Sequence, residues 1–314
     1  MKTLNFLYRT YFLLPNFDFL GKFGKGMNRA IGISFKKLMD ATIPGQFKKL
    51  HLQGGSGINK VIREKDFIVS LTSFPARIDD IWITIECILQ QRFKPDKVIL
   101  WLAEEQFPNK KLPSGLTQLK KRGLEIRFCD DLKAHKKYYY TMKEFPNSYV
   151  ITLDDDLYYD DTIIENLVKM HEENPEVIVT NRAHLMKFNK QAELKKYRNW
   201  QHNVVEKHPS HALLQTGGAG TLFPPNSLDM EVFNKEKIKE LCPLADDIWL
   251  KLMAYKKGTK VMTNTKYNKD PLTILQSQNE KLVSHNVLTG GNDSQLKNVI
   301  EHYNLDLLII SKTN

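Results

Sequence analysis

Short runs of almost continuously apolar residues alternate along the chain with amphipathic segments. Five such runs lie at residues 66–72, 97–102, 124–129, 149–154 and 177–181. A strand covered on both faces has this pattern, whereas a half-exposed strand alternates apolar and polar positions. We therefore predict five strands that are buried inside a sheet.

Segments with a helical period lie between and after these runs. They span residues 78–91, 131–145, 160–174 and 244–258, with a further one around 293–303. The repeated order of strand and helix predicts an α/β fold, an open, Rossmann-like and mostly parallel sheet flanked by helices. In such sheets ligands bind beyond the carboxyl ends of the strands, so Thr72, Ser73 and the residues 154–156 are predicted to lie on one rim.

The N-terminal segment has a different character. Of the net charge of +10, residues 1–65 carry +9, from twelve lysines and arginines against three acids. Aromatic and apolar residues are interleaved with these cations, but the apolar run 4–14 is interrupted by Arg9 and stopped by Pro15. It is shorter than the roughly 20 residues that a spanning helix needs. We predict that residues 1–50 bind an anionic membrane surface; the alternative is a solvated basic arm packed on the domain.

The remaining composition refines this picture. The glycine-rich stretch 50–60 is interpreted as a linker, which divides the chain into a basic region 1–60, a main domain 61–266 and a C-terminal extension 267–314. Three widely spaced cysteines indicate reduced thiols and a cytosolic compartment. The sequence contains no recognised nucleic-acid-binding motif, so nucleic acid is not an expected partner.

Five aspartates follow the fourth apolar run, in "YVITLDDDLYYDD". Asp154 and Asp156, two positions apart at a strand end, can share one Mg²⁺ or Mn²⁺ ion, because these cations prefer oxygen ligands. Asp160 and Asp161 are better explained as the start or cap of the next helix. Residues 154–156 lie several positions before this helix, so capping does not explain them.

Four motifs together resemble a known family. They are "VSLTSFPARI", "VITLDDDLYY", "GGAGTLFPP" and "ADDIWLKLMAY", in this order between residues 66 and 258. They look like a glycosyltransferase of the GT-A fold, closest to bacterial family-2-like enzymes that build capsular or lipopolysaccharide sugars. The resemblance implies a nucleotide-sugar donor, with a UDP-sugar favoured, and a glycan or lipid-linked oligosaccharide acceptor. It also implies an Mn²⁺ or Mg²⁺ cofactor and a place at the inner face of the cell membrane.

The resemblance also assigns roles to individual residues. Asp154 and Asp156 match the Asp-x-Asp motif that holds the metal against the donor diphosphate, and His285 is a candidate third ligand. The expected donor and nucleotide site comprises Thr72, Ser73, Arg77, Asp131, Lys137, Asp154, Asp155 and Gly218. For Arg77, Asp131 and Lys137 the alternative is an ordinary place on the protein surface.

The acidic pair Asp246 and Asp247 matches the position of the base in inverting enzymes of this family. An inverting transfer needs a group that takes the proton from the attacking acceptor hydroxyl, and a carboxylate suits this task. We predict Asp247 as the base, beside Asp246, for which helix capping is the alternative. The processive synthases have an arginine-rich motif after this pair, which the sequence lacks.

Two other functions compete with this prediction. A nucleotidyl- or phosphoryltransferase also joins paired aspartates to a metal, but it needs a glycine-rich phosphate loop at the first strand, where "LTSFPARI" has no glycine. A non-catalytic, membrane-binding α/β protein is the second alternative.

Overall fold

The computed structural model describes residues 1–264, 266–267, 269–275, 290–307 and 310 of the chain. Its main element is a seven-stranded sheet in the order β10-β5-β9-β4-β1-β2-β3. The strands are β1 (Phe67–Thr72), β2 (Lys97–Ala103), β3 (Leu124–Cys129), β4 (Tyr149–Thr152), β5 (Ile178–Thr180), β9 (Thr221–Phe223) and β10 (Val261–Thr263). Strand β9 is antiparallel to both neighbours and the other pairs are parallel. The predicted α/β class with a mostly parallel sheet is confirmed.

The five predicted strands are β1 to β5, each within two residues of its expected ends. Their apolar runs are continuous because both faces of the sheet are covered. Val69 and Leu71 of β1 belong to the core on one face, whereas Ile68 packs with Trp101 on the other. Strand β9 was not predicted, because it lies directly between Gly220 and Pro224, whereas the equally short β5 lies within the longer run 177–181.

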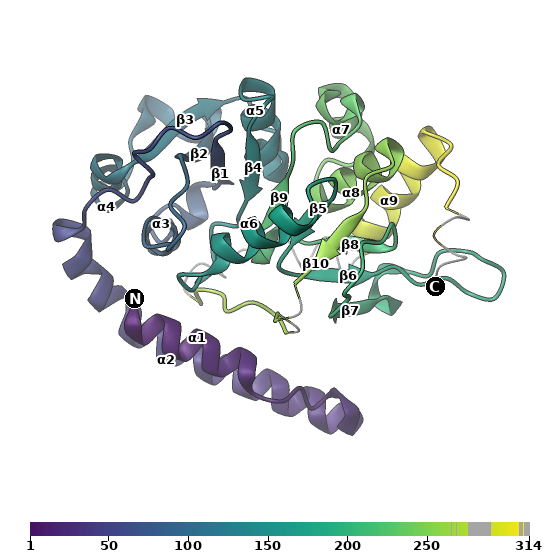
Figure 1. Ribbon diagram of the computed structural model, residues 1–314, viewed down its shortest axis with the longest axis horizontal. Coiled ribbons are helices and arrows are strands. Elements are labelled where there is room, and N and C mark those ends of the chain that lie inside the picture. The colour runs from purple at the N-terminus through teal and green to yellow at the C-terminus, as the bar shows by residue number, and fades with distance from the viewer. Residues whose placement is uncertain (265, 268, 276–289, 308–309, 311–314) are drawn as a thin grey trace.

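Helices cover both faces of this sheet (Figure 1). They are α3 (Ile81–Leu89), α4 (Ser114–Gln118), α5 (Lys136–Glu144), α6 (Ile163–Glu173), α7 (Lys235–Leu241), α8 (Asp246–Lys257) and α9 (Gly291–His302). The apolar sides of α3 and α6 share one core, and those of α5 and α8 share the other. Each predicted helix is present. Four are shorter than expected, and the segment 131–145, for example, begins with a 3-10 turn before α5, whereas α9 begins two residues earlier than predicted.

A small antiparallel sheet lies beside the main one, in the order β7-β6-β8. Its strands are β6 (Ala183–Leu185), β7 (Gln201–Val204) and β8 (Leu213–Gln215). These strands were not predicted, because each has only three or four residues and shows no clear period. Two of the three cysteines are buried, and all three are free thiols as predicted.

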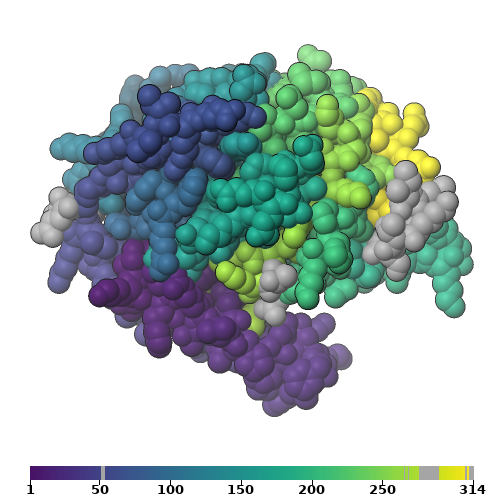
Figure 2. All heavy atoms as spheres, in the orientation of Figure 1, coloured from purple at the N-terminus to yellow at the C-terminus, as the bar shows by residue number. Residues whose placement is uncertain are grey.

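The N-terminal segment forms a helical hairpin of α1 (Lys2–Leu13) and α2 (Gly21–Gln53), which lies along one side of the molecule (Figures 1 and 2). Pro15 follows the end of α1, as predicted. Leu4 and Tyr8 of α1 and Ile43 of α2 are buried in the same core as α3 and α6. Helix α2 continues into the stretch expected to be a linker. No described helix is long and apolar enough to cross a membrane.

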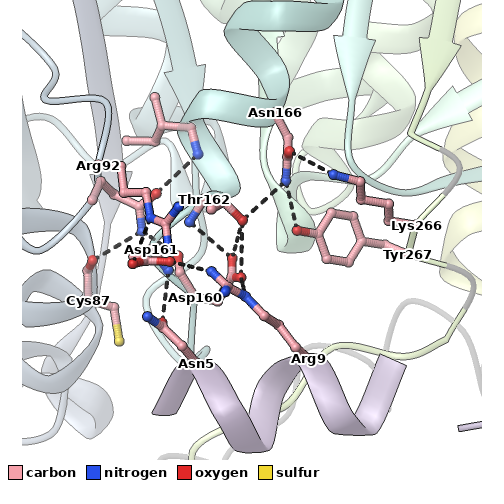
Figure 3. Close-up of polar contacts among 12 residues, drawn as sticks. Asn5, Arg9, Cys87, Arg92, Asp160, Asp161, Thr162, Asn166, Lys266 and Tyr267 are labelled. Carbon is pink, nitrogen blue, oxygen red and sulfur yellow. Dashed lines mark hydrogen bonds and ion pairs between the residues drawn. The ribbon is translucent and has the colours of Figure 1, made fainter. Parts of the chain in front are cut away.

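Asp160 and Asp161 do not cap α6, contrary to the prediction (Figure 3). Helix α6 begins at Ile163, and its N-cap Thr162 makes no side-chain capping bond. Arg9 of α1 instead donates to Asp160 Oδ2 at 3.0 Å and pairs with Asp161 Oδ1 at 2.5 Å. The two carboxylates therefore attach the hairpin to the body, an interaction between segments 150 residues apart that local sequence cannot reveal.

Candidate functional site

Two strand ends bring polar side chains together at the carboxyl edge of the sheet. Strands β1 and β4 pair in parallel, with Ser70 beside Thr152, so the residues after each strand lie side by side. Ser73 Oγ donates a hydrogen bond to Asp155 Oδ2 at 2.5 Å. Thr72 points elsewhere, because its hydroxyl donates to the Trp101 carbonyl at 2.9 Å.

Arg77 forms ion pairs with two of the three strand-end aspartates. Its Nη1 lies 2.7 Å from Asp155 Oδ1 and its Nη2 lies 3.1 Å from Asp156 Oδ2. Burial raises the pKa of Asp155, while Arg77 and Ser73 act in the opposite direction. Arg77 is therefore part of the acidic site and not a free surface arginine.

Lys137 joins the strand-end acids to the acids of α8. Its Nζ, which comes from α5, lies 2.8 Å from Asp154 Oδ1 and 2.8 Å from Asp246 Oδ2. Burial disfavours the charge on Lys137, but Asp154, Asp246 and Asp247 outweigh it and hold the pKa of the ammonium well above its usual value. Two motifs about ninety residues apart thus share one buried cation.

Asp246 and Asp247 occupy the first turn of α8. Ala245 is the N-cap and no side chain caps the helix, so Asp246 does not have the capping role considered as an alternative. Asp247 Oδ1 accepts the Gly217 N–H at 2.9 Å. Burial and the neighbouring Asp246 charge raise the pKa of Asp247 to about 7, although Lys137 opposes the shift.

The turn formed by Gly217–Ala219 closes over the acids from β8. A Cβ on Gly217 would lie 2.8 Å from Lys137 Nζ, and one on Gly218 would lie 3.2 Å from Asp154 Oδ2. A side chain at either position would therefore require Lys137 or Asp154 to shift, and glycine lets the backbone approach the acids without this shift. The resemblance assigned Gly218 to the donor site, and its neighbour Gly217 contacts Asp247 and Lys137 in the same turn.

Asp131 lies apart from this cluster. It pairs with Lys136 Nζ at 2.6 Å and accepts from Gln106 Nε2 at 3.0 Å. It lines a separate cavity of about 460 Å³ beyond β2 and β3, together with Glu104, Glu105, Cys129, Asp130 and Lys239. His285, the predicted third metal ligand, lies outside the described residues.

Some residues of the site were missed in the sequence. Tyr159 accepts the Asp154 N–H at 3.0 Å and donates to the Gly218 carbonyl at 3.0 Å, so it fixes two walls of the site. Arg182 donates to Thr216 Oγ1 at 3.4 Å and pairs with Asp270 at 3.1 Å. Arg182 lies just after the end of β5, as Ser73 lies just after the end of β1. Its place after an apolar run could therefore have indicated a residue at the ligand-binding edge of the sheet.

The comparisons with known proteins do not identify a family. No protein-family model matches the chain, and no curated protein matches its sequence. A mannosyltransferase from Pyrobaculum calidifontis, solved with GDP-Man and Mn²⁺, is 12% identical over 75% of this chain and 66% of its own, with a TM-score of 0.39. A CMP-2-keto-3-deoxy-manno-octonic acid synthetase with CTP gives 10% identity over 64% of this chain and 89% of its own, with a TM-score of 0.39. A cytidylyltransferase from Leptospira borgpetersenii gives 14% identity, 75% and 97% coverage and a TM-score of 0.42.

Proposed function

We propose that the protein is a metal-dependent, inverting glycosyltransferase. It would move a sugar from a nucleotide-sugar donor, a UDP-sugar in the favoured case, to a glycan or lipid-linked oligosaccharide used in bacterial surface polysaccharide synthesis. The observation that carries this proposal is the ion-pair bridge from Asp154 through Lys137 to Asp246. The resemblance assigns donor binding to the aspartates after β4 and proton transfer to those of α8. The bridge supports the view that both groups belong to one site.

The charge of the site is compatible with a divalent cation. Five carboxylates converge here, from residues 154–156, 246 and 247, and their cationic partners are Lys137 and Arg77. Among the described residues no group of three or more His, Cys, Asp or Glu side chains is arranged to hold a metal ion. The protein would supply Asp154 and Asp156, with His285 as the further candidate, and water and diphosphate oxygens would complete the shell, as is usual for Mg²⁺. A bound cation would offset the negative charge that develops on the departing diphosphate.

The donor nucleotide would lie along the carboxyl edge of β1 to β3. Arg77 would place a positive charge near the phosphates, although both of its Nη atoms already pair with Asp155 and Asp156. The cavity that contains Asp131 offers carboxylates to ribose hydroxyl groups. Its volume of about 460 Å³ is within the range of small-ligand sites.

Asp247 would act as the base on the acceptor side. A carboxyl group with a pKa of about 7 is half ionised near neutral pH, which suits a group that must accept a proton in the reaction. Lys137 keeps the neighbouring Asp246 ionised, because its ammonium and His135 lower the pKa of Asp246 against the effect of burial. Gly217 holds Asp247 in place through its N–H.

The acceptor and the location belong to the same proposal. A lipid-linked acceptor requires an enzyme at a membrane, and the basic residues 1–50 would hold the protein at the cytoplasmic face. The hairpin has the required charge, since residues 1–53 contain nine lysines and arginines against two acids.

Thermal shift with a panel of nucleotide sugars tests the proposal. A ligand that binds only the folded protein raises Tm by mass action, so one of the UDP-, GDP-, CMP- or dTDP-sugars should raise it when Mn²⁺ is present and less with EDTA. In Asp156→Asn the Mn²⁺-dependent part of the shift should disappear. If no nucleotide sugar changes Tm with or without Mn²⁺, the proposed donor is wrong.

The nucleotidyltransferase alternative predicts a different product. Such an enzyme would release pyrophosphate from a nucleoside triphosphate in the presence of a sugar, whereas a glycosyltransferase releases a nucleotide from the nucleotide sugar. Measuring both products with the same protein preparation separates the two activities.

A further inference from the structure

The turn end of the N-terminal hairpin exposes large apolar side chains. Leu13, Phe19 and Phe23 are 84%, 78% and 73% exposed, and Leu20 is 44% exposed. We call these four residues the hairpin tip. Figure 2 shows this end of the hairpin, in purple, projecting beyond the rest of the molecule. Apolar side chains in such a group are costly in water, so they indicate an interaction site.

The apolar exposure is concentrated in this hairpin. Of the eleven large apolar side chains that are exposed among the described residues, seven lie between Phe6 and Leu38. Exposed cations accompany them: Lys22, Lys25, Arg29, Lys37, Lys48 and Lys49. A scattered distribution would need no explanation, but one element carries both most of the exposed apolar surface and most of the excess charge.

An anionic lipid bilayer matches this combination. Aromatic and leucine side chains enter the boundary between headgroups and acyl chains, while lysines contact anionic headgroups. Nucleic acid would use the cations and leave Phe19 and Phe23 in water. A purely apolar protein partner would leave the lysines without counter-charges.

The other part of the hairpin holds a segment of the body. Lys269 Nζ donates to the Tyr11 carbonyl at 2.8 Å and also to the Leu14 carbonyl, and Tyr11 Oη donates to the Asp270 carbonyl at 3.0 Å. Asp40 of α2 accepts the Leu275 N–H at 3.0 Å. Residues 269–275 are thus fixed at both ends by α1 and α2.

This segment forms part of the wall of the acidic site. The Ile274 N–H donates to the Asp156 carbonyl at 2.8 Å, and the Tyr158 N–H donates to the Leu272 carbonyl at 2.9 Å. Pro271 lies beside Gly218, whose Cβ position would be 3.9 Å from Pro271 Cγ. The hairpin is therefore connected, through residues 269–275, to the stretch 156–158 between β4 and α6, which includes the candidate metal ligand Asp156.

We propose that the hairpin tip inserts into an anionic lipid bilayer and that the docked hairpin steadies residues 269–275 against the acidic site. This inference rests on the membrane location proposed above and adds the residues that contact lipid and the route to the site. Membrane binding then regulates the site through the hydrogen bonds of Tyr11, Asp40 and Lys269.

Vesicle co-sedimentation without any nucleotide tests the docking. The protein should bind vesicles of phosphatidylcholine with phosphatidylglycerol and bind pure phosphatidylcholine weakly. Replacing Leu13, Phe19 and Phe23 by Ser should weaken binding about tenfold or more, because the apolar contribution is lost. The matched control is Val61→Ser with Ile62→Ser, two exposed apolar residues outside the hairpin, which should bind like the unchanged protein. Equal loss in the control, or full binding by the tip variant, would overturn the docking surface.

Hydrogen exchange on the vesicle-bound protein tests the link to the site. The amides of Leu275 and Ile274 should exchange about twofold or more slowly when the full chain is bound, because fewer local openings occur. Tyr11→Phe should keep vesicle binding and lose part of this protection. Unchanged exchange on binding would overturn the regulatory part. A different result would also overturn the proposal: the unchanged protein does not bind vesicles and is a dimer, whereas the tip variant is a monomer. The tip would then be a contact between two copies of the protein. None of these measurements needs transferase activity. The docking proposal can therefore fail or succeed independently of whether a nucleotide-sugar donor is found.

Discussion

Asp247 has the surroundings of a proton acceptor. It is partly buried beside the buried Asp246, and its pKa is raised to about 7 while the Gly217 N–H donates to one of its oxygens. Asp246 has the opposite shift because Lys137 lies next to it. Two adjacent carboxyl groups therefore differ in charge near neutral pH, and only the group that can hold a proton suits acid–base chemistry.

Asp247→Asn should lower kcat for sugar transfer by about 100-fold or more, because the amide cannot accept the proton. In the unchanged enzyme the rate should fall as the pH falls through about 7, where the carboxylate becomes protonated. The pH profile of kcat is the measurement, with Asp79→Asn, an exposed aspartate ahead of α3, as control. A flat profile between pH 5 and pH 8 would mean that another group takes the proton.

Lys251 of α8 is an example of a buried charge without compensation. It is fully buried, its Nζ finds no hydrogen-bond partner among the described residues, and burial lowers its pKa to about 7. In the unfolded chain the lysine has its ordinary pKa of about 10.4. Between pH 7 and pH 10 the unfolded chain therefore binds more protons at this residue than the folded chain does. Stability therefore rises with pH from about 7 towards 10 through this residue.

Lys251→Met should raise the free energy of unfolding at pH 7 by an amount on the order of 3 kcal/mol, because it removes this desolvation cost. It should also flatten the rise of stability between pH 7 and pH 10. Denaturant unfolding at several pH values measures both effects, and Lys257→Met, an exposed lysine of the same helix, serves as control. A destabilised Lys251→Met protein would show that the ammonium has a partner after all.

At the scale of elements, the turn Gly217–Ala219 is the part that brings backbone to the acids. Gly217→Ala places a methyl group 2.8 Å from Lys137 Nζ, so the ammonium must shift within the site that it shares with Asp154 and Asp246. We expect transfer activity to fall about 10- to 100-fold while Tm changes little, since small displacements of reacting groups cost this much. The control is Gly45→Ala in α2, where an added Cβ meets nothing within 4 Å. Equal rates for the two variants would contradict the assigned role of the turn.

The elements differ in how far the sequence could predict them. Strands β1 to β5 were predictable because burial on both faces leaves continuous apolar runs, whereas β9 is enclosed by Gly220 and Pro224 and belongs to no longer run. The strand-end aspartates were predictable from their place after β4. The bridge through Lys137 was not, because it depends on how α5 and α8 pack, and helix packing leaves no local signature in the chain.

At the scale of the whole molecule, the N-terminal hairpin is both a surface feature and part of the core. Its tip is exposed, but its inner side contributes buried residues to the core shared with α3 and α6: Leu4, Leu7, Tyr8, Tyr11, Met39, Ile43 and Phe47. The sequence suggested membrane binding and packing on the domain as alternatives. The packing is present in the structure, and it leaves the tip free to contact a membrane.

Deletion of residues 1–50 should therefore damage the fold instead of simply releasing the protein from membranes. It would expose the apolar surface of α3 and α6, at a cost of roughly 1.5–3 kcal/mol for each large side chain that loses its cover. Gel filtration and thermal unfolding measured by circular dichroism should show aggregation or a large drop in Tm. A monomeric truncated protein with an unchanged Tm would show that the hairpin is dispensable for folding.

The central claim is that the acidic site at the carboxyl edge of the sheet transfers sugar from a nucleotide donor with the help of a divalent cation. The most direct test is the initial rate of nucleotide release from the donor that stabilises the protein, measured with Mn²⁺ and with EDTA. We predict Mn²⁺-dependent release by the unchanged protein and by Asp79→Asn, and loss of release in Asp156→Asn. Release at the same rate by Asp156→Asn, or the same rate with EDTA, would contradict the claim.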